Sequence, residues 1–310
     1  MNKIINLFWY KHDTGKGNFG DELNYYIVKG LSGITPKHVD ILKLPRNKIM
    51  AVKAILKKLY DRKINVNQVF NSEDWLTITG KDVIVGIGSV ISWFDAPNIT
   101  VWGSGLLNRN GHINEAKFLA VRGKYTLKRL NELGYNQDPV LGDPALLLPL
   151  IKKIPKIINK TRIGIIPHYI HYKFIKENLA KSDFLVINLL GSIEEIIKEI
   201  NSCSVTFSSS LHGIIVSHAY NVQSLWVDFS SLENMNLSGD NIKFKDYFSS
   251  VGLKNYDPIK ITNDLSFVDN IDALKNDYKD FLLPSQSIVK NIQNNLLAKA
   301  PFKIKEEFLN

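Results

Sequence analysis

The chain has 310 residues, of which 45% are hydrophobic and 22% are charged, and its formal net charge is +9 at pH 7. This is a globular composition, and the length exceeds what one hydrophobic core usually supports, which predicts two domains. Cys203 is the only cysteine, which excludes an intrachain disulfide and a cysteine-rich metal site. The single cysteine favours a reducing, cytoplasmic compartment. Since no apolar run approaches the roughly 18 residues of a membrane span, we expect the protein to be soluble or peripheral to a membrane.

The basic residues are dispersed along the chain. Their densest runs, residues 53–63 and 150–160, contain no arginine-rich or aromatic-interleaved pattern. We therefore expect no nucleic-acid partner. A solvated basic face is the simplest interpretation, and attraction to anionic lipid or to an anionic substrate is the alternative.

Strand-like and helix-like periods alternate from the N-terminus onward, which predicts an α/β fold with parallel sheets covered by helices. A helix is expected from Asp21, with Leu23, Ile27 and Leu31 on one face and Gly33 at its end. The predicted strands of the first half are residues 4–10, 75–80, 82–88, 99–105 and 118–123.

A polar, basic segment with a proline, residues 151–160, is interpreted as a linker, and beyond it the alternation restarts. We predict domains 1–150 and 151–310, the second ending in a helical segment. Both would be Rossmann-like, doubly wound halves facing a cleft, with ligands outside the carboxyl ends of the strands. The second half is predicted to have strands at 162–167, 184–190, 203–207 and 223–229, and helices at 192–202 and from Leu211.

Serines and a histidine crowd the point where a predicted strand passes into a helix, in "TFSSSLHGIIVSHAY", residues 206–220. Ser209 and Ser210 would lie where the unpaired N–H groups of the helix face the cleft, which favours an anion site. His212 at the same edge can give or take a proton near neutral pH. The alternative is that the serines only cap the helix and His212 is a hydrogen-bonded surface residue.

Other candidates follow from the same geometry. Asp21 would cap a helix or accept a hydroxyl proton. Gly88 and Ser89 lie in a glycine turn, "GIGS", whose amides could approach a ligand. Arg122, at a strand end, would form a bidentate contact with a carboxylate or phosphate, or a structural ion pair. Asp143, in a Gly-Asp-Pro turn, is interpreted as structural.

His168 follows a strand and His171 comes three residues later, a spacing that could suggest a metal pair. A structural metal site needs about four ligands, and no third candidate is nearby. We therefore expect no metal.

Seven motifs in sequence order resemble those of the polysaccharide pyruvyl transferase family: "NFGDELN", "GIGS", "WGSG", "VRGKYTLKRLNELG", "GDPALLLP", "IIPHY" and "SSSLHGIIVSHAY". The resemblance runs from about residue 17 to residue 229. It implies a two-domain fold like that of GT-B glycosyltransferases. It also implies transfer of the enolpyruvyl or pyruvyl unit of phosphoenolpyruvate, as donor substrate, onto a sugar of a cell-surface polysaccharide or a lipid-linked oligosaccharide, commonly as a ketal and with no further cofactor.

The resemblance also implies residue roles. His212 would be the general acid, Arg122 a ligand of the phosphoenolpyruvate anion, and Leu211 part of the donor site. This chain departs from the pattern at Ser210, where many members have arginine. The missing cation would then come from His168 or from a lysine such as Lys124.

The acceptor side would include Asp21, Gly88 and Ser89, because the sugar is expected in the N-terminal half. Two alternatives stay open. A glycosyltransferase using a nucleotide sugar would need an acidic ribose ligand, but Glu194 and Glu195 fit better as the first turn of a helix. A non-catalytic member scaffolding polysaccharide assembly is the other.

Overall fold

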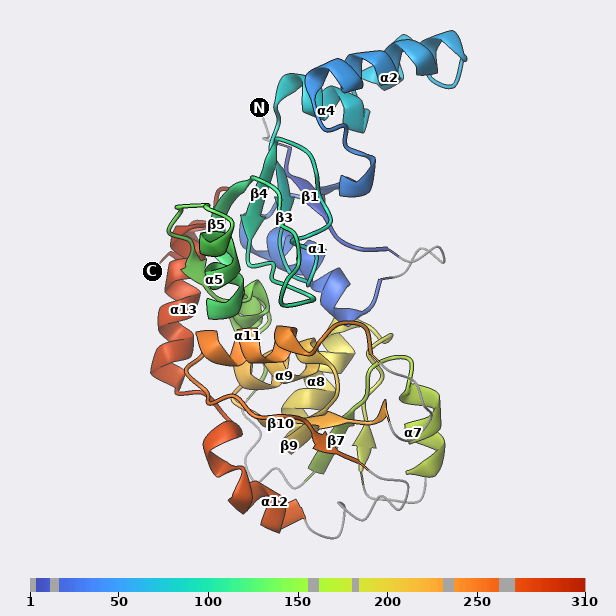
Figure 1. Ribbon diagram of the computed structural model, residues 1–310. Helices are drawn as coiled ribbons and strands as arrows, with labels where there is room; N and C mark the ends of the chain where they lie inside the picture. The colour runs from blue at the N-terminus through green and yellow to red at the C-terminus, as the bar shows by residue number, and fades with distance from the viewer. Residues whose placement is uncertain are drawn as a thin grey trace.

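The computed structural model describes residues 4–11, 17–155, 162–179, 184–230, 237–261 and 271–309. It contains two parallel sheets, one in each half of the chain (Figure 1). The first sheet has the order β2-β1-β3-β4-β5-β6. Its strands are β1 (Asn6–Phe8), β2 (Lys37–His38), β3 (Val83–Val85), β4 (Ile99–Trp102), β5 (Lys117–Val121) and β6 (Val140–Leu141).

The first helix, α1 (Phe19–Ser32), begins and ends for local reasons. The Asn18 side chain caps it by accepting from the Asp21 N–H, and Gly33 ends it in the left-handed conformation, φ 73°. The predicted face of Leu23, Ile27 and Leu31 is buried, which confirms this helix.

The second sheet has the order β11-β10-β9-β7-β8. Its strands are β7 (Arg162–Ile166), β8 (Leu185–Val186), β9 (Cys203–Ser208), β10 (Gln223–Asp228) and β11 (Ile259–Lys260), and its helices include α7 (Tyr172–Asn178), α8 (Ile193–Ser202) and α9 (Leu211–Ala219). The strands predicted at 162–167, 203–207 and 223–229 and the start of α9 are confirmed, whereas the strand predicted at 184–190 is shortened to β8. Residues 156–160 of the predicted linker lie outside the described residues.

The two sheets share one winding pattern. Read from β2 to β5 and from β8 to β11, each places its first strand between the second and the third. The chain therefore reverses its direction of travel across the sheet between β1 and β3, and again between β7 and β9. Loops leaving the carboxyl ends of such strand pairs diverge and leave a crevice, which is where ligands bind in sheets of this kind.

The C-terminal helix α13 (Gln286–Ala298) packs against the first half and contacts β6, whereas α5 (Lys124–Glu132) packs in a different core cluster of that half. The Trp102 indole N–H donates to the Leu296 carbonyl at 3.1 Å, and Lys305 N–H donates to the Leu31 carbonyl at 2.9 Å. The predicted C-terminal helical segment thus returns to the first sheet instead of extending the second. The remaining described elements of the second half are α11 (Ile242–Ser250), α12 (Ile271–Asp277), η4 (Lys279–Phe281) and η5 (Glu306–Phe308).

The strand predicted at 75–80 is wrong, because this segment is the helix α4 (Glu73–Thr79). Ser72 caps it by accepting from the Trp75 N–H, and Gly80 ends it in the left-handed conformation. These end signals outweigh the alternation of apolar and polar residues that favoured a strand. With η1 (Ile41–Lys43), α2 (Lys48–Tyr60) and α3 (Val66–Val69), α4 forms an arm, residues 41–80, that projects from the first sheet (Figure 1).

One of the three apolar core clusters of the described residues runs through both halves. It includes Leu23 of α1, Leu146 of η2 (Pro144–Leu147), Ile214 of α9 and Leu296 of α13. A short helix, α6 (Leu148–Ile151), continues η2. The two halves are therefore packed together, which fixes the walls of any crevice between them. No helix within the described ranges has the length and apolar content to cross a bilayer.

Candidate functional site

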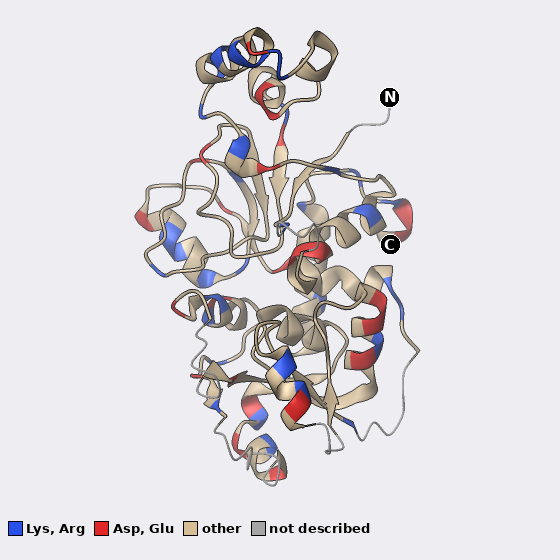
Figure 2. Cartoon of the chain, turned by 90° about the vertical axis from the view of Figure 1, so that its right-hand side faces the viewer, with Lys and Arg blue, Asp and Glu red and all other residues tan. Residues whose placement is uncertain are grey.

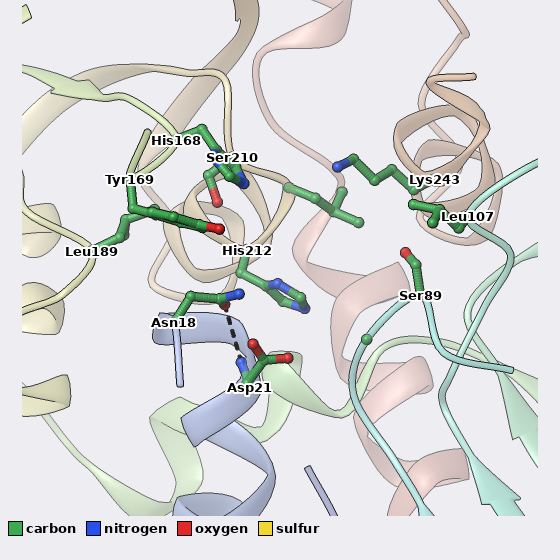
Figure 3. Close-up of a pocket in the computed structure, with 12 residues that line it drawn as sticks. Asn18, Asp21, Ser89, Leu107, His168, Tyr169, Leu189, Ser210, His212 and Lys243 are labelled. Carbon is green, nitrogen blue, oxygen red and sulfur yellow. Dashed lines mark hydrogen bonds between the residues drawn. The ribbon is translucent and has the colours of Figure 1, made fainter. Parts of the chain in front are cut away.

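A cavity of about 130 Å³ opens between the two halves (Figure 3). Its walls come from the loops that follow β1, β3, β4, β7, β8 and β9, all at carboxyl ends of strands, and from α11. The lining residues are Asn18, Asp21, Gly88, Ser89, Leu107, His168, Tyr169, Leu189, Ser210, Leu211, His212 and Lys243. An adjoining hollow of about 300 Å³ shares much of this lining and adds Tyr10, Val90, Trp93, Ile170, Leu237 and Ser238.

The turn between β9 and α9 is tied to the neighbouring strand. Ser209 donates its N–H to the Ile166 carbonyl at 3.1 Å, and its hydroxyl accepts from the His168 N–H at 2.9 Å. Ser210 is the N-cap residue of α9, but its side chain makes no capping hydrogen bond. The first turn of α9 therefore keeps its N–H groups unsatisfied by a side-chain cap, at the edge of the cavity. Ser209 is buried behind that edge.

His212 is held between α1 and η2. Its ring packs so closely on Gly20 of α1 that a methyl group added there would overlap it. The His212 Nε2 atom lies 3.8 Å from the Asp143 Oδ2 atom, and neither atom has a hydrogen-bond partner in the structure. The separation is too long for a hydrogen bond and lies within ion-pair range if the imidazole is protonated.

Asp143 is fully buried and has two functions. Its Oδ1 atom accepts from the Ala145 N–H at 3.0 Å and caps η2, so the structural role predicted for it is confirmed. Its other oxygen faces the imidazole. The sequence could not predict this second contact, because the packing of η2 on α9 brings Asp143 and His212 together.

Asp21 lies in the first turn of α1 but does not cap it, because Asn18 does. Its carboxylate lies at the cavity beside the His212 ring (Figure 3). The neighbouring turn after β3 is held by Asn24, which accepts from the Ile87 N–H at 2.7 Å and donates to its carbonyl at 2.9 Å. Gly88 in this turn has φ 126°, which favours glycine. The turn thereby presents Gly88 and Ser89 to the cavity.

Arg122 is fully buried and does not line the cavity. Its guanidinium donates to the Asp246 carboxylate at 3.2 Å, to the Ser89 hydroxyl at 2.8 Å and to the Leu106 carbonyl at 2.5 Å. The expectation that it contacts the donor directly is therefore not met in this arrangement, and the structural ion pair is present. Arg122 reaches the cavity only through Ser89.

Lys124 also lies elsewhere. It is exposed at the start of α5, in a separate hollow with Lys128 and Ser249. The expectation that it supplies the cation at Ser210 is likewise not met, because Lys124 does not line the cavity and its backbone N–H donates to the Ser249 hydroxyl at 2.9 Å.

Lys243, which the sequence did not single out, is the cation that does line the cavity. Burial, and then the charge of Arg122, lower its pKa to about 8. Lys243 lies on α11, one turn before Asp246, whose carboxylate accepts from the Thr126 N–H at 2.9 Å and its hydroxyl at 2.6 Å. The buried Arg122–Asp246 pair thus fixes the helix that carries Lys243.

His168, one of the two expected sources of the missing cation, lines the cavity. Burial lowers its pKa to about 4, with smaller contributions from Lys243 and His171. It is therefore neutral near pH 7 and offers a hydrogen bond instead of a positive charge. Within the described ranges, no three histidine, cysteine, aspartate or glutamate residues gather as a metal site would require.

Comparison with known proteins agrees with the motif order. The family profile described as Polysaccharide pyruvyl transferase matches residues 18–231. This range contains every residue of the cavity lining except Lys243. The chain is also 33% identical over 243 residues to the uncharacterized protein L143 of Acanthamoeba polyphaga mimivirus, a match covering 72% of this chain and 81% of that protein. No solved structure matches. The chain belongs to the polysaccharide pyruvyl transferase family.

Proposed function

We propose that the protein transfers the pyruvyl unit of phosphoenolpyruvate onto two hydroxyls of a sugar in a polysaccharide or its lipid-linked precursor, forming a ketal and releasing phosphate. The observation that carries the proposal is the meeting of His212, Asp21 and Lys243 in one cavity of a chain of this family. A proton donor, a proton acceptor and an anion ligand are the groups that such a transfer needs.

The donor anion would bind at the wall of the cavity that the second half of the chain forms. Lys243 supplies the positive charge that Ser210 lacks, and the N-terminus of α9 adds N–H groups and a favourable dipole. The Ser210 hydroxyl adds a hydrogen bond, since it is not used as a cap. Neutral His168 and the backbone at Leu211 complete this wall.

His212 would protonate the methylene carbon of phosphoenolpyruvate. The C=C electron pair forms the new C–H bond, and positive character develops at the neighbouring carbon, which a sugar hydroxyl attacks. A second hydroxyl then displaces phosphate at the same carbon and closes the ketal. Asp143 faces His212 at 3.8 Å and would hold the orientation of the imidazole.

The acceptor would bind in the adjoining hollow. Tyr10 and Trp93 line it with their rings edge to face, at a centroid separation of 5.5 Å. Such rings bury apolar area at low entropic cost, and sugars present apolar C–H faces to them. Asp21 and Ser89 line both hollows, which suits Asp21 for accepting the hydroxyl proton. Because phosphoenolpyruvate is a cytoplasmic metabolite, we place the reaction in the cytoplasm, at the inner face of the membrane if the acceptor is lipid-linked.

The alternative of a nucleotide-sugar glycosyltransferase gains no support from the site. Glu195 is bonded to Ser192 at 2.7 Å at the start of α8, and Glu194 lies beside Tyr26, so neither lines the cavity. The GT-B-like relation between the two sheets, and the absence of a cofactor or metal requirement, stay predictions from the resemblance.

Mass spectrometry of candidate glycans incubated with the protein and phosphoenolpyruvate tests the proposal. We expect a product heavier by one pyruvyl unit less water, with one phosphate released for each unit transferred. Glycans that gain a sugar from a nucleotide sugar and nothing from phosphoenolpyruvate would reject pyruvyl transfer. Phosphoenolpyruvate binding without phosphate release across the acceptor panel would instead support the scaffold alternative.

A further inference from the structure

The arm, residues 41–80, carries most of the exposed large apolar side chains of the described residues. Leu42, Ile49, Met50, Val52, Leu56, Tyr60, Val66 and Phe70 belong to it, whereas Ile4, Leu190, Ile288 and Leu309 are spread over the rest. Scattered exposed apolar residues are ordinary, but a concentration in one projecting element marks an interaction surface.

The apolar residues on α2 form a stripe on the side that faces away from the protein. Ile49, Val52, Leu56 and Tyr60 recur at helical spacing, and they are 68%, 44%, 61% and 89% exposed. The opposite side of α2 already packs the arm together, because Ala51 and Ile55 are buried. Nothing in the folding of the arm therefore requires the outer stripe.

Packing of the arm is completed by an ion pair on that inner side. Lys58 of α2 donates to the buried carboxylate of Asp74 in α4 at 2.5 Å. This ion pair fixes α2 relative to α4. The apolar stripe of α2 is therefore a preformed, exposed surface.

The same helix is strongly basic. Residues 41–60 contain Lys43, Arg46, Lys48, Lys53, Lys57 and Lys58, and no aspartate or glutamate. Figure 2 shows this concentration of Lys and Arg on the arm. Lys48, Lys53 and Lys57 are exposed, and within the described residues none of them forms a salt bridge. Their charges are thus available to an outside partner.

We propose that the arm is a docking surface for an anionic membrane, with the apolar stripe of α2 inserted among the headgroups and its lysines on the lipid phosphates. Apolar and cationic side chains on one exposed helix are what interfacial binding requires. A second copy of the chain is disfavoured, because a symmetric contact would bring the basic helix of each copy against the other.

The position of the arm separates docking from chemistry. The arm leads directly into β3, so it lies at the amino-terminal end of the first sheet, whereas the cavity lies at the carboxyl end. Docking through the arm would decide where the protein resides and would leave the reacting groups untouched. The proposal therefore stands or fails independently of the proposed function.

Vesicle sedimentation tests the charge. We expect wild-type protein to bind phosphatidylglycerol-rich vesicles better than phosphatidylcholine vesicles, and to be released as salt rises. Replacing Lys48, Lys53 and Lys57 with Gln should weaken binding to the anionic vesicles about 100-fold, since each surface lysine contributes about a factor of 5. The matched control replaces the exposed Lys198, Lys290 and Lys303 with Gln, which changes the net charge equally but off the arm, and should have little effect.

A fluorescent label tests insertion. Cys203 is buried, so Leu56→Cys creates the single accessible thiol for an environment-sensitive dye, and Leu309→Cys is the control. We expect a blue shift on adding anionic vesicles at position 56 only, with transfer to a soluble glycan unchanged in both.

Three results would overturn the proposal: no preference of the wild-type chain for anionic vesicles, equal loss in the two lysine triples, or no spectral change at position 56. Light scattering adds a fourth. If the arm variants convert a dimer to a monomer, the arm is a contact between copies and not a membrane surface.

Discussion

The two walls of the cavity differ in the charge and the chemical type of the side chains that they contribute. The second half and α11 contribute His168, His212 and Lys243, whereas the first half contributes Asp21 and neutral groups such as Ser89. A wall with the Lys243 ammonium and helix N–H groups suits an anionic donor, and a wall with a carboxylate and a hydroxyl suits a sugar that loses protons. This difference is the basis for proposing the donor on one side of the cavity and the acceptor on the other.

Arg122 does not belong to either wall, and replacing it should have the largest effect. Arg122→Met leaves the buried Asp246 carboxylate without its cation, which should cost about 3–5 kcal/mol of stability in urea unfolding. Arg122→Lys keeps a charge and should lose less. A stable Met variant with weakened phosphoenolpyruvate binding would instead move Arg122 into the donor wall.

His212 should dominate the chemistry of the donor wall. His212→Gln keeps size and some hydrogen bonding but removes the titrating proton, so turnover should fall about 10²-fold or more. Thermal stability and phosphoenolpyruvate binding should stay near those of the wild type. Unchanged turnover with an unchanged pH profile would remove His212 from the mechanism.

Lys243 should affect donor binding more than turnover. Lys243→Met removes a charge-assisted contact to phosphate, so the KM for phosphoenolpyruvate should rise about 10- to 100-fold. Because burial lowers the Lys243 pKa to about 8, the cation is present below that pH and is lost above it. The wild-type kcat/KM for phosphoenolpyruvate should therefore fall as pH rises through about 8, and the Met variant should lack this limb.

The control for this charge is Lys245→Met on the same helix. Lys245 pairs with the exposed Asp257 at 2.8 Å and lies outside the cavity lining. The Lys245→Met substitution should leave both the KM for phosphoenolpyruvate and the pH dependence of kcat/KM unchanged. Equal behaviour of the two variants would exclude Lys243 as the donor cation.

Asp143 should have the smallest effect, because it acts through His212. Asp143→Asn retains an oxygen for the Ala145 N–H but loses the charge facing the imidazole, so kcat should fall about 10-fold with little change in KM. A loss of stability without a fall in kcat would mark Asp143 as a cap only.

Local sequence was sufficient for much of this molecule. Asn18 and Gly33 delimit α1, and the apolar runs of β7 and β9 are buried from both sides as parallel strands require. The serine-rich turn and His212 were placed at a strand end by the same pattern, and they line the cavity or stand directly behind it. These features depend on residues within one or two turns of one another.

What the tertiary structure decided depends on residues far apart in the chain. Arg122 and Asp246 are 124 residues apart. Arg122 forms a buried ion pair, instead of contacting a ligand, only because the fold packs these two residues together. Lys243 has no local signal, since its reduced pKa and its place in the cavity come from α11 lying against Arg122. The packing of α13 on Trp102 likewise joins residues far apart in the chain, because the Trp102 indole bonds to Leu296. Periodicity records which face of an element is buried; it carries no information about the partner that buries it, because many partners satisfy the same pattern.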